Sequence, residues 1–166
     1  MTTKVDNTEI LYFQITDLWK RFCEEHTRLL DLTFEEYSSL LSSDVEELEN
    51  ILARKNEIIS IIRRLEETRQ SVIKDLNQKQ GVSISNVSDL ITFMCQYEAE
   101  KNQKHLANFN ALLIDLIEKL KSQNKKNQLF LNKAISSLKN IKESALGKKS
   151  FATYSNSGIE KSNTVP

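Results

Sequence analysis

Glycine and proline are almost absent from this chain. Its three glycines are Gly81, Gly147 and Gly158, and its single proline is the last residue, Pro166. Residues 7–80 and 82–146 therefore lack the two residue types that most strongly interrupt helices. The sequence predicts an all-α protein, a long antiparallel hairpin or bundle of three to four helices with a disordered C-terminal tail.

Long apolar runs and cysteines are also scarce. No run of about 18 apolar residues is present, so we expect no membrane insertion. The N-terminus lacks the basic stretch and apolar core of a secretory signal. Two cysteines, Cys23 and Cys95, are too few for a disulfide framework, and we expect them to be reduced thiols that face the core. These features are typical of a cytoplasmic protein.

Arginine is missing from the second half of the chain, which is nevertheless basic. Residues 1–80 hold 11 Lys and Arg against 16 Asp and Glu, whereas residues 81–166 hold 12 Lys against 7 acids. Between Lys119 and Lys149 there are nine lysines and one acid, Glu143. Arginine provides the bidentate contacts to phosphate and guanine, so its absence argues against nucleic-acid binding. The pattern favours a basic helix that packs beside an acidic helix or an acidic partner.

The first half of the chain is predicted to form two helices, over residues 7–41 and 44–79. Ser43 and Glu46 have the spacing of a capping box, which places the start of the second helix at Asp44. Lys55 interrupts the apolar stripe of the second helix, and Trp19 is expected to cover the edge of the first. The stripe of the first helix consists of Leu11, Ile15, Leu18, Phe22, Leu29, Leu30, Phe34, Tyr37 and Leu41. That of the second consists of Val45, Leu48, Leu52, Ile58, Ile59, Ile62, Leu65, Val72, Ile73 and Leu76.

The second half is predicted to contain a short helix over 87–97 and a long one over 101–146, which completes a helical domain of residues 1–147. Residues 98–105 offer little to bury and are either exposed helix or a local break. Residues 148–166 are rich in Ser, Thr and Asn and are expected to form a flexible polar tail. Within the last helix, Asn124 and Asn127 fall on the apolar face. They predict a kink, a register-fixing pair, or the point where the helix leaves its bundle.

Residues that would support catalysis or bind a cofactor are sparse. No Gly-rich phosphate loop is present. A structural zinc site needs four ligands, and beyond Cys23 and His26 only Cys95 and His105 are suitable. A histidine phosphotransfer domain would expose a histidine beside basic residues, and His105 is the better candidate for one. We expect no enzyme activity, no metal and no cofactor.

Three stretches resemble the FlgN-type export chaperones of the bacterial flagellar type III secretion system. They are SSDVEELENILARKNEIISIIRRLEETRQ (42–70), SQNKKNQLFLNKAISSLKNI (122–141) and ATYSNSG (152–158). The second is similar to the last helix of the family, in which two asparagines three apart precede an amphipathic segment. In the third, a tyrosine precedes a small polar run and a glycine. The resemblance in pattern covers nearly the whole chain.

This resemblance implies a small cytoplasmic chaperone without catalytic activity. Such proteins bind the C-terminal helices of hook-filament junction (hook-associated) proteins and deliver them to the export gate. Carried over to this chain, the client-binding residues are Asn124, Asn127, Leu131, Ile135, Leu138, Ile141 and Leu146, and Tyr154 is the candidate for docking on the gate. Two features depart from the family pattern: Lys142 lies within the stripe, and eight residues follow Gly158. The alternatives are an unrelated coiled-coil or bundle adaptor and, on the same apolar stripe, a self-dimer.

Overall fold

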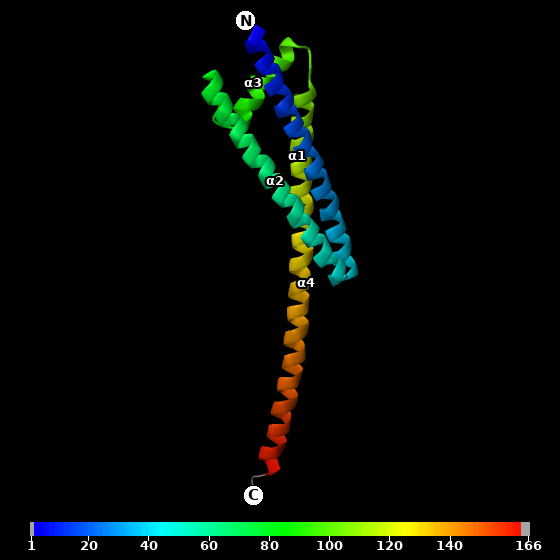
Figure 1. Ribbon diagram of the computed structural model, residues 1–166. Coiled ribbons are helices and arrows are strands. Elements are labelled where there is room, and N and C mark those ends of the chain that lie inside the picture. The colour runs from blue at the N-terminus through cyan, green and yellow to red at the C-terminus, as the bar shows by residue number, and fades with distance from the viewer. Residues whose placement is uncertain (1, 164–166) are drawn as a thin grey trace. The chain divides into compact units, whose positions relative to one another are not determined.

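The computed structural model describes the backbone of residues 2–163 and the side chains of residues 7–147. It contains four helices, α1 (Thr2–Ser42), α2 (Val45–Gln80), α3 (Val87–Glu100) and α4 (His105–Asn163), and no strand among the residues described. Figure 1 shows α1 and α2 as an antiparallel pair. The predicted all-α class of long antiparallel helices is confirmed.

A tight turn connects α1 to α2. Ser43 adopts a left-handed backbone conformation with φ 57°. Its N–H donates to Leu40 O at 3.4 Å and the N–H of Asp44 donates to Ser39 O at 3.0 Å, which is the Schellman arrangement for ending a helix. The N-cap of α2 is Asp44, whose side chain accepts from the N–H of Glu47 at 3.0 Å. The predicted capping box of Ser43 and Glu46 is therefore wrong by one residue, because Ser43 is used to end α1.

The connection between α2 and α3 contains the glycine that was predicted to end the second helix. Gly81 has φ 64°, the left-handed conformation that glycine adopts without steric cost. The side-chain amide of Asn77 then pairs with the backbone N–H and carbonyl of Ile84, both at 2.8 Å. Asn86 caps α3 by accepting from the N–H of Asp89 at 2.8 Å. Side-chain to backbone hydrogen bonds therefore hold this loop at both ends.

The stretch 98–105 contains a local break, and α4 begins at His105 rather than at residue 101. Asn102 provides the turn with φ 53°, and its N–H donates to Ala99 O at 3.3 Å. Asparagine tolerates this left-handed conformation better than most residues. Because this helix end contains no glycine, the sequence alone did not decide between exposed helix and a local break.

The main hydrophobic core lies among the helices of residues 1–125 and takes side chains from all four. Its fully buried members include Tyr12, Ile15 and Trp19 of α1, Leu90 and Met94 of α3, and Leu106 of α4. A second cluster, nearer the α1–α2 turn, consists of Leu29, Leu32, Ile51 and Ile58. Burial of apolar side chains at about 1.5–3 kcal/mol each is what holds these helices together.

Trp19 lies at the centre of the core, so the prediction that it covers the edge of a stripe is wrong. Its side chain is 0% exposed, and its Nε1 donates to Oδ1 of Asn110 on α4 at 3.1 Å. The ring also contacts Phe22 in an edge-on geometry. A buried indole N–H needs an acceptor, and Asn110 provides it across 91 positions of sequence.

Several residues of the predicted stripes of α1 and α2 are exposed. Phe34 and Leu41 are 51% and 56% exposed, and Val45 and Leu52 of α2 are 65% and 44% exposed. In this region α1 instead buries Leu32 and Thr33, which lie to one side of the predicted line. The cause is geometric: residues seven apart drift by about 20° around a straight helix, so a heptad-like stripe leaves the core over several turns.

Lys55, the charge that interrupts the stripe of α2, is paired. Its Nζ forms an ion pair and hydrogen bond with Oε2 of Glu36 on α1, and both side chains are largely buried at 13% and 15% exposed. An ammonium group inside an interface is tolerated when a carboxylate compensates it. The neighbouring pair of Arg54 and Glu35, at 3.4 Å, is about half exposed.

The chain divides into two compact units, residues 1–125 and residues 126–166. The first holds α1, α2, α3 and the beginning of α4, and the second holds the rest of α4. The backbone of α4 continues past Gly147 to Asn163, beyond the predicted helix end at residue 146. A single glycine costs a helix only about 1 kcal/mol, and nothing lies within 4 Å of the position that a Cβ of Gly147 would take.

Candidate functional site

One face of α4 changes from buried to exposed along the helix. Positions three, four or seven residues apart share a helix face. On this face Leu106, Leu113 and Leu116 are 0%, 7% and 6% exposed and belong to the main core. Beyond them the same face carries Gln123 and Asn127, both buried, and then a row of apolar side chains.

This row, called here the exposed stripe, consists of Leu131, Ile135, Leu138, Ile141 and Leu146. Their side chains are 37%, 54%, 66%, 65% and 54% exposed. All five belong to α4. Leucine and isoleucine at these spacings form a ridge for helix-against-helix packing, and a contiguous apolar surface of this kind marks an interaction site more often than chance.

The two asparagines of the predicted site have different environments. Asn127 is 3% exposed, whereas Asn124 is exposed to solvent, so the prediction that both lie on the buried apolar face holds for Asn127 alone. Gln123, which the sequence reasoning missed, is 6% exposed. Its signal was present in the sequence, because Gln123 precedes Asn127 by one helical turn on the same face. Two buried amides thus mark the boundary between the core face of α4 and the exposed stripe.

A lysine lies within the exposed stripe. Lys142 follows Leu138 by four residues and precedes Leu146 by four, so it lies on the line that joins them. Its side chain is exposed, as are those of Lys125, Lys126, Lys133 and Lys139. The remaining predicted residue, Tyr154, lies outside the described side chains.

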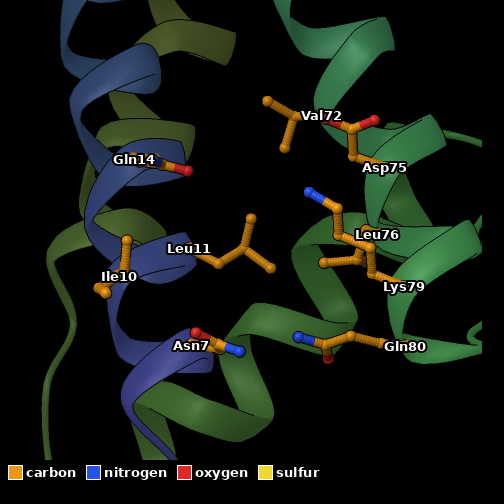
Figure 2. Close-up of a pocket in the computed structure, with 9 residues that line it drawn as sticks. All are labelled: Asn7, Ile10, Leu11, Gln14, Val72, Asp75, Leu76, Lys79 and Gln80. Carbon is orange, nitrogen blue, oxygen red and sulfur yellow. The ribbon is translucent and has the colours of Figure 1, made fainter. Parts of the chain in front are cut away.

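A separate cleft lies between the beginning of α1 and the end of α2. It has a volume of about 360 Å³, and Figure 2 shows Leu11 and Val72 directed into it from opposite sides. Asn7 and Gln80 face each other across one end. Among the side chains that the structure describes, Asp75 and Lys79 are the charged groups that line it. One carboxylate and one ammonium among amide and apolar side chains do not make a metal or acid–base site, so the cleft has no evident chemistry of its own.

The cysteines and histidines do not come together in a common metal site. Cys23 is buried and its Sγ donates to Phe109 O at 3.3 Å, while Nδ1 of His26 lies 2.7 Å from Phe22 O. His105 is the exposed first residue of α4. Within the described ranges, no three His, Cys, Asp or Glu side chains are grouped so as to hold a metal ion. No helix in the described part of the chain is long and apolar enough to cross a membrane.

One of three comparisons with known proteins gave a match. The family model described as FlgN protein matches residues 11–162, which leaves out only the first ten and the last four residues. Searches of curated proteins and of solved structures gave no match. Because the family model spans the helical core and the exposed stripe alike, the chain belongs to the FlgN family, whose members are flagellar export chaperones rather than enzymes.

Proposed function

We propose that this chain is a cytoplasmic export chaperone for the hook-associated junction proteins. In this proposal the exposed stripe of α4 binds the C-terminal helix of a client and keeps it soluble before export. The chaperone then brings the client to the export gate of the flagellar type III system. Family membership supports the chaperone role. The choice of client follows the resemblance of residues 122–141 to the last helix of the family, and the exposure of the stripe supports the choice of binding surface.

The observation that carries the proposal is the change of environment along one helix face. Leu116 is 6% exposed on this face, whereas Leu138 is 66% exposed. Five exposed Leu and Ile side chains in a row are a cost to a free protein, because each still presents apolar area to water. Covering what remains exposed would contribute roughly 5 kcal/mol before the costs of association are subtracted. The stripe alone therefore gives weak binding, and polar contacts must add to it.

A matched pair of substitutions tests the client site. Leu138→Asp places a charge in the stripe, whereas Leu129→Asp places the same charge elsewhere on the same helix. Leu129 is 51% exposed and lies two residues before Leu131, about 200° around the helix from it. We expect Leu138→Asp to abolish co-purification with C-terminal fragments of the hook-associated proteins and Leu129→Asp to preserve it. Equal binding by both variants would exclude the stripe as the client site.

Residues 152–158 resemble the tail of the FlgN-type chaperones, and on this ground we assign the tail a role in docking on the export gate. In the proposal Tyr154 docks on the cytoplasmic domain of the export gate after the client has bound. Tyr154→Ala should leave the affinity for client fragments unchanged and reduce secretion of the junction proteins. Loss of client binding in this variant would instead place Tyr154 in the client site.

A further inference from the structure

The part of α4 that carries the exposed stripe is strongly basic. Residues 125–147 contain five lysines and one acid, Glu143. All five lysine side chains are exposed. In the part of the chain that the structure describes, none of these five lysines lies within ion-pair distance of a carboxylate. The first paired lysine on the N-terminal side of this segment is Lys119, whose Nζ lies 2.7 Å from a carboxylate oxygen of Asp115. The apolar stripe is thus bordered by five lysines and a single acid, with a net charge of about +4 over residues 125–147.

The position of Lys142 limits which partner surfaces can cover the exposed stripe. Any partner that covers both Leu138 and Leu146 also covers the position between them, which Lys142 occupies. An ammonium group taken out of water is unfavourable unless a carboxylate or several hydrogen-bond acceptors replace the lost hydration. An entirely apolar partner surface is therefore a poor fit to this stripe.

A lysine within an apolar helix face also occurs in the contact between α1 and α2. Lys55 lies in the apolar face of α2, and the helix that covers it, α1, places Glu36 against it. Both of these side chains are largely buried, so a lysine in a helix–helix contact is compensated here by a glutamate from the opposite helix. The stripe of α4 presents the same combination of apolar side chains with one lysine among them, but without the opposite helix.

Two other occupants fit less well. A second copy of the stripe would bring two sets of lysines together, and like charges across an interface are unfavourable. A membrane surface attracts lysines at the borders of an apolar face, but Lys142 lies in its middle, where the acyl chains would be. A helix with acidic residues satisfies both the apolar side chains and the lysines.

We propose that the partner segment is an acidic amphipathic helix that places one Asp or Glu directly against Lys142. This proposal rests on the client-binding role of the stripe and adds the chemistry of the client. The carboxylate compensates Lys142 in the middle of the contact, and further acids along the borders of the partner helix face Lys125 and Lys139. Charge selects the partner, and the leucines and isoleucines supply the buried area.

The test compares two leucine substitutions in the full chain. Lys142→Leu removes the charge inside the stripe, and Lys133→Leu removes one about 180° away on the same helix. Affinity is measured by titration with a labelled C-terminal fragment of a hook-associated protein. Lys142→Leu should weaken binding by about 30-fold, because a buried carboxylate loses its partner. Lys133→Leu should change the affinity by less than about threefold, as expected of an exposed charge.

The identity of the opposite group follows from a second series. Each Asp and Glu of the fragment is changed to Asn or Gln in turn, and one of these changes should weaken the wild-type complex by the same factor while having no further effect on Lys142→Leu. If Lys142→Leu binds as tightly as the wild type, or more tightly, the acidic-partner proposal is wrong although client binding through the stripe stands.

Failure of the underlying function has a different signature. If the wild-type chain binds no hook-associated fragment at all, both proposals fall. If it instead sediments with phosphatidylglycerol vesicles and Leu138→Asp prevents this, the occupant is a lipid surface and the acidic-helix proposal is wrong. Self-association that Leu138→Asp abolishes would likewise overturn it in favour of a second copy.

Discussion

The carboxylate of Glu98, near the end of α3, accepts a hydrogen bond at 3.1 Å from the backbone N–H of Ala107, in the first turn of α4. The backbone carbonyl of Glu98 also accepts from the N–H of Gln103 at 2.9 Å. The first turn of a helix has N–H groups without intrahelical partners, and a carboxylate stabilises them. One buried residue, 2% exposed, therefore connects α3 to α4 across the break at 101–104.

Replacing Glu98 by alanine should destabilise the fold by about 2–3 kcal/mol. The change leaves the Ala107 N–H without its acceptor and a void where a buried side chain was. Glu100→Ala, an exposed acid of the same helix, is the control and should change stability by less than about 0.5 kcal/mol. Urea unfolding followed by circular dichroism measures both. Equal stability of the two variants would show that the contact of Glu98 with Ala107 contributes nothing.

The pair of Trp19 and Asn110 is open to a double-mutant cycle. Asn110→Ala leaves the buried indole N–H without an acceptor and should cost about 1–3 kcal/mol. In a Trp19→Phe background the same substitution should cost less, because no N–H remains to be satisfied. The difference between the two values measures the hydrogen bond that joins α1 to α4. Identical costs in both backgrounds would mean that the 3.1 Å contact is not a stabilising hydrogen bond.

The two parts of α4 should respond differently to the same substitution. Leu116→Asp buries a charge in the main core and is expected to cost more than about 3 kcal/mol or to unfold the protein. Leu138→Asp, at 66% exposed, should change the melting temperature by only a degree or two. Thermal unfolding of the two variants beside the wild type is the measurement. A large loss of stability for Leu138→Asp would place that residue in a core rather than on a binding surface.

Much of the fold follows from local signals in the sequence. The scarcity of helix breakers predicted the long helices. Gly81 predicted the end of α2, because glycine readily adopts the left-handed conformation that ends a helix, and it does so here. What local signals could not supply was which residues the other helices would contact. Trp19 and Phe34 lie on neighbouring faces of α1 by sequence alone, yet one is fully buried and the other is 51% exposed.

The candidate site was predictable as a pattern but not as a surface. Periodicity places Leu131, Ile135 and Leu138 on one face of the last helix whether or not anything covers them. Their exposure, and the burial of Gln123 and Asn127, depend on tertiary contacts that periodicity does not specify. The sequence likewise showed that Lys55 interrupts the apolar stripe of α2, but not that Glu36 of α1 would pair with it, because that contact depends on how the two helices pack.

Alkaline pH should destabilise the protein through Tyr12. Burial raises the pKa of Tyr12 above its ordinary value, and the nearby Glu98 carboxylate adds to the effect although Thr16 opposes it. The folded state therefore favours the neutral phenol, so this contribution to stability is complete below about pH 10 and is lost as the pH rises through the raised pKa. Tyr12→Phe should reduce the fall in unfolding free energy that occurs as the pH rises above about 10. An unchanged fall would assign it to other groups.

The two thiols should react slowly and in a defined order. Burial raises the pKa of Cys23 and of Cys95, and the carboxylates of Glu24 and Glu98 respectively add to the rise. Because the thiolate is the reactive form, both should react with iodoacetamide at neutral pH more slowly than free cysteine, and faster as the pH is raised. Cys95 is only partly buried and should react first, whereas Cys23 is buried and hydrogen-bonded to Phe109 O. Peptide mapping at successive times measures the order, and equal rates for both thiols in the native protein would contradict the burial of Cys23 beneath α4.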